Sequence, residues 1–234
     1  MIDSKYFFKG FKSIKGVGSP AIALGASFVA IGALLKNLGF SIQESIFSTF
    51  LTYALPGSLV MAESMLIGAS LINIFIAVWL VNARLYPMTV ALMPLLMHEN
   101  QPRWKYYLSC HFIAVSSWLI MKDNYENIEK ENRIDFWIGI GTATWSVAIF
   151  ATVIGFIASD FLNKDMLIGL AIVNPIYFIC MMIGAMKTIQ ISASVILGAI
   201  LGPIFYFISP EWCILFGGFI AGTIAYLLGE KNDN

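Results

Sequence analysis

The polar residues of this chain that are able to bind a solute lie inside long apolar runs. Asn82 and Arg84 lie near the middle of one such run, between Ala69 and Met97. If the run crosses a membrane, an arginine at its centre costs on the order of 3 kcal/mol, so Arg84 must face a polar cavity or a carboxylate. We predict that both residues bind substrate. If the run forms two shorter helices, the Arg84 side chain instead reaches the headgroups.

A proline and a glycine interrupt the preceding apolar run, where residues 52–58 read TYALPGS. Pro56 removes a backbone donor and clashes with the preceding turn, and Gly57 lets the chain leave helical angles. We predict a broken helix whose free backbone groups bind substrate, with a simple proline kink as the alternative. The substrate-binding candidates here are Thr52, Tyr53, Pro56 and Gly57.

A third interruption is the Val-Asn-Pro sequence at residues 173–175. Pro175 is expected to break the helix, and Asn174 adds further donors and acceptors for substrate. The third and sixth apolar runs thus share a Val-Asn pair followed by proline. They lie three crossings apart, which is the parity that inverted-topology repeats require. An inverted repeat is one hypothesis, and coincidence in an apolar alphabet is the other.

Two titratable residues, Glu63 and His111, are candidates for proton or ion coupling. Glu63 lies near the end of the second run, where it either carries a proton, pairs with Arg84, or sits at the outer interface. His111 follows Ser109 and Cys110 in the fourth run. A lone histidine there is either a proton relay or a packed, hydrogen-bonded residue.

Motifs for a metal, a cofactor or an enzymatic reaction are missing from the sequence. The histidines and cysteines form no ligand cluster, and there is no phosphate-binding loop, dinucleotide fingerprint or nucleophile elbow. Cys110 and His111 are adjacent, but neighbouring residues on a helix point about 100° apart. We therefore expect no metal, no cofactor, no enzymatic activity and no nucleic-acid partner.

Composition identifies the elements that must position these residues. Hydrophobic residues make up 59% of the 234 positions, charged residues 12%, and the mean hydropathy is +0.79. Soluble domains carry about 25% charged residues, so this chain is expected to lie in a lipid bilayer. A spanning helix needs about 20 apolar residues. Eight runs meet that need: Pro20–Leu38, Glu44–Ile67, Ala69–Met97, Trp104–Met121, Phe136–Ala158, Met166–Met186, Ile191–Ile208 and Trp212–Leu228.

The predicted fold is therefore an all-α polytopic transmembrane helical bundle with seven or eight spanning segments, several of them broken. Residues 1–19 form an amphipathic segment, 20–229 a single transmembrane domain and 230–234 a tail. The charged segment 122–135 is expected to be a solvated loop. Glycines at 18, 25, 32 and 39 give the first helix a small face for close packing, and Gly198/Gly202 and Gly218/Gly222 do the same near the C-terminus.

The N-terminal segment carries lysines at positions 5, 9 and 12 beside aromatic residues, which predicts a short helix on the cytoplasmic membrane surface and no signal peptide. A cytoplasmic N-terminus with eight crossings places most Lys and Arg residues inside, as the positive-inside rule requires. A re-entrant second segment gives seven crossings and a more even split.

Three short sequences carry a resemblance to a known family: GASL at 68–71, WLVNAR at 79–84 and ALMP at 91–94. They resemble the AzlC family, and the similarity extends over about residues 16–229. Asn82 and Arg84 match its Asn-x-Arg pattern. The chain departs from it at Leu85, where the family often has histidine, and at Ser109-Cys110-His111, where it often has Thr-Asp-Glu.

The resemblance implies the large subunit of a bacterial branched-chain amino-acid exporter with a small AzlD-like membrane partner. Together with the broken helices, it leads us to expect gradient-driven export of a neutral amino acid by alternating access across the cytoplasmic membrane. Two alternatives are a structural membrane subunit and a transporter of a different small solute.

Overall fold

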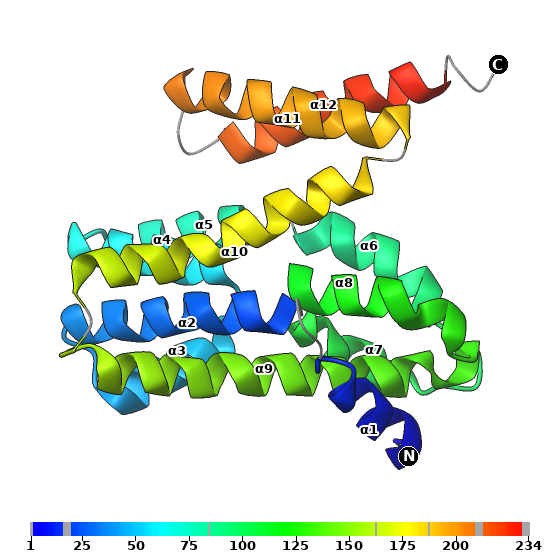
Figure 1. Cartoon of the computed structure of the whole chain (residues 1–234), viewed down its shortest axis with the longest axis horizontal. Coiled ribbons are helices and arrows are strands. Elements are labelled where there is room, and N and C mark those ends of the chain that lie inside the picture. Colours follow the sequence, from blue (N-terminus) through cyan, green and yellow to red (C-terminus); the bar gives the residue numbers. More distant parts are fainter. Residues whose placement is uncertain are drawn as a thin grey trace. The chain divides into compact units, whose positions relative to one another are not determined.

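The computed structural model describes residues 2–15, 20–83, 85–161, 163–186, 188–208 and 213–230. Within these ranges every regular element is an α-helix or a short 3-10 helix, labelled η (Figure 1). The predicted all-α fold is thereby confirmed. The chain divides into two compact units, Met1–Asn174 and Pro175–Asn234, and each is described by itself.

The first unit is organised around a long apolar helix, α9 (Arg133–Ala158), with α2 (Pro20–Asn37) lying along it. Gly25 faces Val147, and Gly32 contacts the backbone of Thr152, so the two helices run in the same direction. Close approach of this kind needs small residues. It confirms the small packing face of the first helix at Gly25 and Gly32, whereas Gly18 lies outside the described residues.

The predicted N-terminal helix is α1 (Ser4–Lys12), and it packs on the start of α9. Gly10 contacts the backbone of Phe136, and Gly139 contacts the backbone of Phe7. The lysines at positions 5, 9 and 12 are exposed. The helix itself is confirmed, and one side of it is already occupied by α9. Its location on the membrane surface stays a prediction.

The second apolar run is broken as predicted, into α3 (Ile42–Leu51) and α4 (Leu55–Leu66). Ser41 and Glu44 cap each other reciprocally at the start of α3. The break is residues 52–54, and Pro56 sits in the first turn of α4, where its missing N–H costs nothing. The Thr49 and Thr152 hydroxyls are 3.0 Å apart, so the last turn of α3 lies beside the C-terminal half of α9.

After α4 the chain turns back into the third apolar run. A turn at residues 67–70 joins α4 to α5 (Leu71–Asn82), which packs against it, and α6 (Leu85–Leu96) follows with a bend of 46°. Arg133 donates to the Leu95 carbonyl at 3.2 Å, so α6 ends beside the start of α9. In Figure 1, α4 and α5 lie level with the C-terminal half of α9 and α6 with its N-terminal half. Residues 42–66 thus enter and leave at one end, and we name them the first hairpin.

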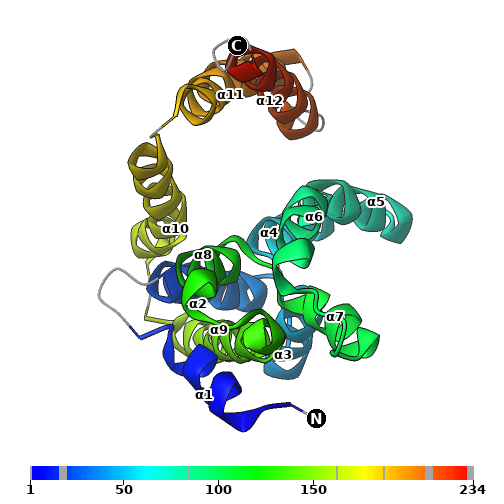
Figure 2. The ribbon, with the colours of Figure 1, turned by 90° about the vertical axis from the view of Figure 1, so that its right-hand side faces the viewer.

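The fourth apolar run also folds back, which corrects the predicted single crossing over Trp104–Met121. It consists of α7 (Arg103–Ser109), η1 (Cys110–Phe112) and α8 (Val115–Asn124), which we name the second hairpin. The Ser117 hydroxyl accepts the Ala114 N–H at 3.0 Å and donates to the Phe112 carbonyl at 2.6 Å. Serine hydroxyls that bond to nearby backbone compete with the helix in this way. Figure 2 shows α2 next to both α8 and α9.

The segment after α8 differs partly from the predicted solvated loop. It contains η2 (Tyr125–Asn127) and η3 (Lys130–Asn132) and leads directly into α9. Its charged residues up to Glu131 are exposed, as expected. Asp135, however, lies in the first turn of α9 and is buried, because a lysine from α7 pairs with it.

Helix α10 (Lys164–Ala185) runs without interruption through Asn174 and Pro175, so the break expected at Pro175 is wrong. One proline removes a single hydrogen bond, which the rest of a long apolar helix tolerates. In the second unit, α11 (Ile189–Ile208) and α12 (Cys213–Glu230) pack against each other where Gly217 approaches Gly202.

Among the described residues three helical segments are long and apolar enough to cross a membrane: Pro20–Asn37, Lys130–Ala158 and Ile189–Ile208. The bent pair α5 and α6 meets the same test if it is one broken span. The seven or eight crossings and the inverted repeat stay predictions.

Candidate functional site

The tips of the two hairpins meet beside Trp145, near the middle of α9. The Trp145 ring lies 4.6 Å from the Phe50 ring and 6.1 Å from the His111 ring, measured between centroids. The indole N–H donates to the Phe50 carbonyl at 3.3 Å. The hairpins enter from opposite ends of α9, so their tips meet midway along it.

Tyr53 occupies the tip of the first hairpin. Its ring stacks on Phe28 of α2 at 6.4 Å and lies 6.4 Å from the ring of His111 in the second hairpin. The side chain is 4% exposed. Its hydroxyl has Thr144 as a neighbour, but no described group meets it in hydrogen-bonding geometry. A buried hydroxyl without a partner costs about 1–3 kcal/mol, which makes this position a candidate for ligand contact.

Asn82, at the end of α5, lies directly against Gly57 at the start of α4. A Cβ atom on Gly57 would come within 2.6 Å of the Asn82 amide nitrogen, so only glycine leaves room for this amide. The amide oxygen Oδ1 is buried and has no described hydrogen-bond partner. The structure therefore brings together two substrate-binding candidates that are far apart in the sequence.

Unpaired buried polar atoms gather around the first hairpin. Of the described side chains, those with such an atom belong to the hairpin itself, to α2 and to the end of α5: Ser27, Ser48, Tyr53 and Asn82. The Ser58 hydroxyl, by contrast, donates to the Ala54 carbonyl at 3.2 Å, within the break. Thr52 and Pro56 are half-buried beside it.

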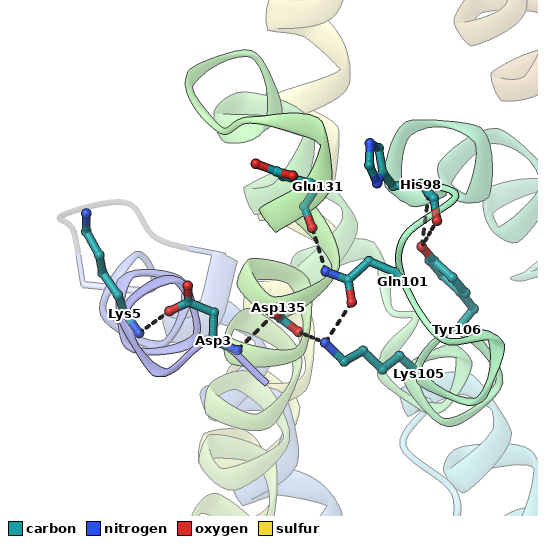
Figure 3. Close-up of polar contacts among 8 residues, drawn as sticks. All are labelled: Asp3, Lys5, His98, Gln101, Lys105, Tyr106, Glu131 and Asp135. Carbon is teal, nitrogen blue, oxygen red and sulfur yellow. Dashed lines mark hydrogen bonds and ion pairs between the residues drawn. The ribbon is translucent and has the colours of Figure 1, made fainter. Parts of the chain in front are cut away.

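The second hairpin carries a buried ion pair that the sequence analysis missed (Figure 3). Lys105 Nζ lies 2.6 Å from Asp135 Oδ1, and the two side chains are 0% and 2% exposed. The other carboxylate oxygen accepts the backbone N–H of Asp3 at 3.0 Å, and Lys105 also donates to Gln101 at 2.8 Å. The pair thus ties α1, α7 and α9 together. The available signal was two opposite charges near the starts of neighbouring apolar runs.

An open depression leads from the charged end of this unit toward the second hairpin. It has a volume of about 1180 Å³ and reaches Cys110, which precedes His111. Its wall combines charged, polar and apolar side chains from α6, α7 and the connecting segments. The lining residues are Met93, Met97, His98, Glu99, Asn100, Gln101, Arg103, Tyr106, Tyr107, Cys110 and Lys130.

Of the two coupling candidates, His111 lies at the meeting point of the tips and Glu63 does not. Glu63 is exposed on α4, about two turns beyond Pro56, and no described interaction joins it to the tips. His111 is exposed but packs edge-on against Trp145. Arg84 lies outside the described residues, as do the side chains of Asn174 and Pro175. The described residues contain no group of three or more potential metal ligands.

Comparison with known proteins gives one match. The sequence pattern of the AzlC protein family matches residues 20–162, which include both hairpins and all of α9. No curated protein and no solved structure matches the chain. The matched region therefore contains both tips and the ion pair.

Proposed function

Because this match covers more than half of its 234 residues, the chain belongs to the AzlC family, and we propose that it is the large subunit of an amino-acid exporter. The proposed substrates are neutral, branched-chain amino acids, moved across the bacterial cytoplasmic membrane by alternating access. The proposed partner is a small AzlD-like membrane subunit. Transport draws on a proton or ion gradient, and the chain is not an enzyme.

The observation that carries this proposal is the set of unpaired polar atoms at the break of the first hairpin. An amino-acid zwitterion needs hydrogen-bond donors for its carboxylate and acceptors for its ammonium group. The Tyr53 hydroxyl is a donor and Asn82 Oδ1 an acceptor, and both are buried and unpaired. Around Tyr53, the buried side chains of Leu24, Phe28 and Ile31 supply an apolar wall for an aliphatic side chain.

The distribution of charge supports a cytoplasmic N-terminus. The hydrogen bonds of Asp135 and Arg133 bring α1, the start of α7 and the loop before α9 to one end of the first unit. These segments contain most of its lysines and arginines, while Lys36 and Lys164 lie toward the other end of α9 and beyond. Positive charge accumulates on the cytoplasmic side of membrane proteins, so this end faces the cytoplasm.

We assign proton or ion coupling to two titratable residues, His111 and Glu63. His111 lies at the meeting point of the tips, and the depression at the cytoplasmic end reaches the residue before it. Glu63 is the carboxylate on α4. Both side chains are exposed, so water reaches them, as coupling to a proton gradient requires.

Efflux measurements test the proposal. Cells expressing the chain with its small partner are loaded with labelled valine or leucine, and efflux is compared at matched membrane expression. Asn82→Ala and Arg84→Ala are expected to reduce efflux at least about tenfold, the loss of one good hydrogen bond to a charged group. Asn132→Ala, at the N-cap of α9, removes a half-buried amide that donates to Glu129 and is expected to leave efflux unchanged.

Two outcomes would contradict the proposal. If no amino acid leaves the cells, the chain moves a different solute. If the partner exports valine equally well without this chain, or if Asn82→Ala and Arg84→Ala are as active as wild type, the chain is a structural subunit and its polar tip has another purpose.

A further inference from the structure

Each hairpin presents the start of a helix at its tip. α4 begins at Leu55 and has 12 residues, and α8 begins at Val115 and has 10. The first backbone N–H groups of a helix have no partner within it, and they carry the positive end of its dipole. Since the tips of the two hairpins meet beside Trp145, both positive helix ends lie near the middle of α9.

Both helix starts lie against the same buried cluster. Leu55 and Ala114 pack against side chains that include Phe28 and Tyr53, and Trp145 packs there too. Neither N-cap residue caps its helix with its own side chain, because the N-cap residues are Ala54 and Ala114. At α8 the Ser117 hydroxyl accepts the Ala114 N–H at 3.0 Å. Helix starts in proteins are usually capped by serine, threonine, aspartate or asparagine. Pro56 has no N–H, so the groups that remain available to an anion are the N–H groups of Leu55 and Gly57 at α4 and those of residues 115–117 at α8.

A second and independent observation indicates a ligand at this place. The Tyr53 hydroxyl, on a side chain 4% exposed, has Thr144 as a neighbour but meets no described group in hydrogen-bonding geometry, and its ring lies 6.4 Å from the rings of both Phe28 and His111. A phenol O–H is a good donor to a carboxylate. The unpaired acceptor, Asn82 Oδ1, lies at the start of the same α4 helix.

We propose that the N-terminal N–H groups of α4 and α8, together with the Tyr53 hydroxyl, form a carboxylate-binding site shared by the two hairpins. Asn82 Oδ1 then binds the ammonium group of the same solute. This assignment rests on the proposed function, and it adds which atoms hold each end of the amino acid. A solute held by both helix starts joins the two hairpins, so its binding and release are coupled to their relative movement.

A carboxylate supplied by the protein itself should occupy this site. Ala54→Asp and Ala114→Asp each place an aspartate at the N-cap, where it stabilises the helix and occupies the N–H groups. The variants are therefore expected to fold. Ala54→Asn and Ala114→Asn have the same shape without the charge. Ser70→Asp adds the same charge at the exposed start of α5 and serves as the matched control.

Three probe molecules distinguish binding of the carboxylate from binding of the ammonium group. L-valine has both groups, 3-methylbutanoate has only the carboxylate, and L-valinamide has only the ammonium. Binding to the purified full-length protein is measured by equilibrium dialysis, and competition is measured against labelled valine. We expect 3-methylbutanoate to compete and valinamide to compete at least about tenfold less well. Both aspartate variants are expected to weaken the binding of valine and of 3-methylbutanoate at least about tenfold. Ser70→Asp is expected to leave the binding of both unchanged.

The possible results show separately whether the carboxylate site is wrong and whether the proposed function is wrong. If valine is exported but the aspartate variants bind and export it like wild type, the carboxylate site is wrong and the exporter stands. If 3-methylbutanoate binds and is lost in the aspartate variants while no amino acid is bound or exported, the site stands and the amino-acid function is wrong. Failure of all carboxylates to bind overturns the site.

Discussion

The two hairpins break their helices at the same level along α9 but differ in whether the hydroxyl groups near the break have hydrogen-bond partners. In the second hairpin, the Ser117 hydroxyl bonds to backbone on both sides of the turn, and the Ser109 carbonyl accepts the Trp137 indole N–H at 3.3 Å. In the first hairpin, the Ser48 and Tyr53 hydroxyls are buried without described partners.

This difference distinguishes the second hairpin, which stabilises the fold, from the first hairpin, which we propose binds solute. Lipid offers no hydrogen bonds, so polar groups at membrane depth must be satisfied by protein, by water or by a ligand. The second hairpin pairs its Ser109 and Ser117 hydroxyls with its own backbone and is tied to α9 by the Lys105–Asp135 pair. The first hairpin keeps unpaired groups at a destabilising cost, and bound solute would supply the missing partners. In the proposed site the first hairpin thus supplies the unpaired side-chain groups, and the second hairpin supplies only backbone N–H groups and is held in place by the ion pair.

The largest expected effect is loss of the ion pair. Asp135→Ala leaves the Lys105 ammonium buried without its carboxylate, which costs about 3–5 kcal/mol of unfolding free energy. The measurement is the thermal unfolding midpoint of the purified protein in detergent. Lys105→Met with Asp135→Leu removes both charges and is expected to recover most of the loss.

The control for this prediction is the exposed pair of Lys36 and Asp160. Its atoms are 2.8 Å apart, but the side chains are 29% and 69% exposed. Asp160→Ala is therefore expected to change the unfolding free energy by less than about 1 kcal/mol. If Asp135→Ala unfolds at the wild-type midpoint, the pair does not hold the second hairpin and the contrast between the hairpins fails.

A smaller effect is expected from the serines of the two hairpins. Ser117→Ala leaves the Phe112 carbonyl and the Ala114 N–H without their partner, at a cost of about 1–3 kcal/mol. Ser48→Ala removes a hydroxyl that has no partner, so stability is expected to stay the same or to rise. The stability of each variant is measured by its thermal unfolding midpoint in detergent. Equal losses in the two variants would contradict the distinction.

The sequence predicted the first hairpin better than the second, for a physical reason. Pro56 and Gly57 change what the backbone is able to do, so the break in the helix was visible locally. The second hairpin turns at Ile113 and Ala114, which are ordinary helix residues, and its turn depends on the Ser117 hydroxyl. Serine in an apolar run usually bonds back to its own helix, so it gives no reliable sign of a turn.

The candidate site was also predicted only where a local sequence signal exists. Thr52, Tyr53, Pro56 and Gly57 were predictable because they share one interruption, and Asn82 because it is polar within an apolar run. The contact of Asn82 with Gly57 and the ion pair of Lys105 with Asp135 join residues distant in sequence. Such contacts depend on how the hairpins fold back. Pro175 shows the opposite error, since a local signal for a break was overridden by a continuous α10.

A comparison of two buried tyrosines involves only small expected changes in stability, and it is the most informative about binding. Tyr106, in the second hairpin, has a hydroxyl that accepts the His98 backbone N–H at 3.0 Å, so Tyr106→Phe is expected to cost about 1 kcal/mol. Tyr53→Phe removes an unpaired hydroxyl, so stability is expected to change by less than about 1 kcal/mol, toward stabilisation. Valine efflux is expected to fall only in Tyr53→Phe. A variant that is as stable as wild type yet inactive would show that this hydroxyl is kept for the solute, whereas full efflux in Tyr53→Phe would remove it from the binding site.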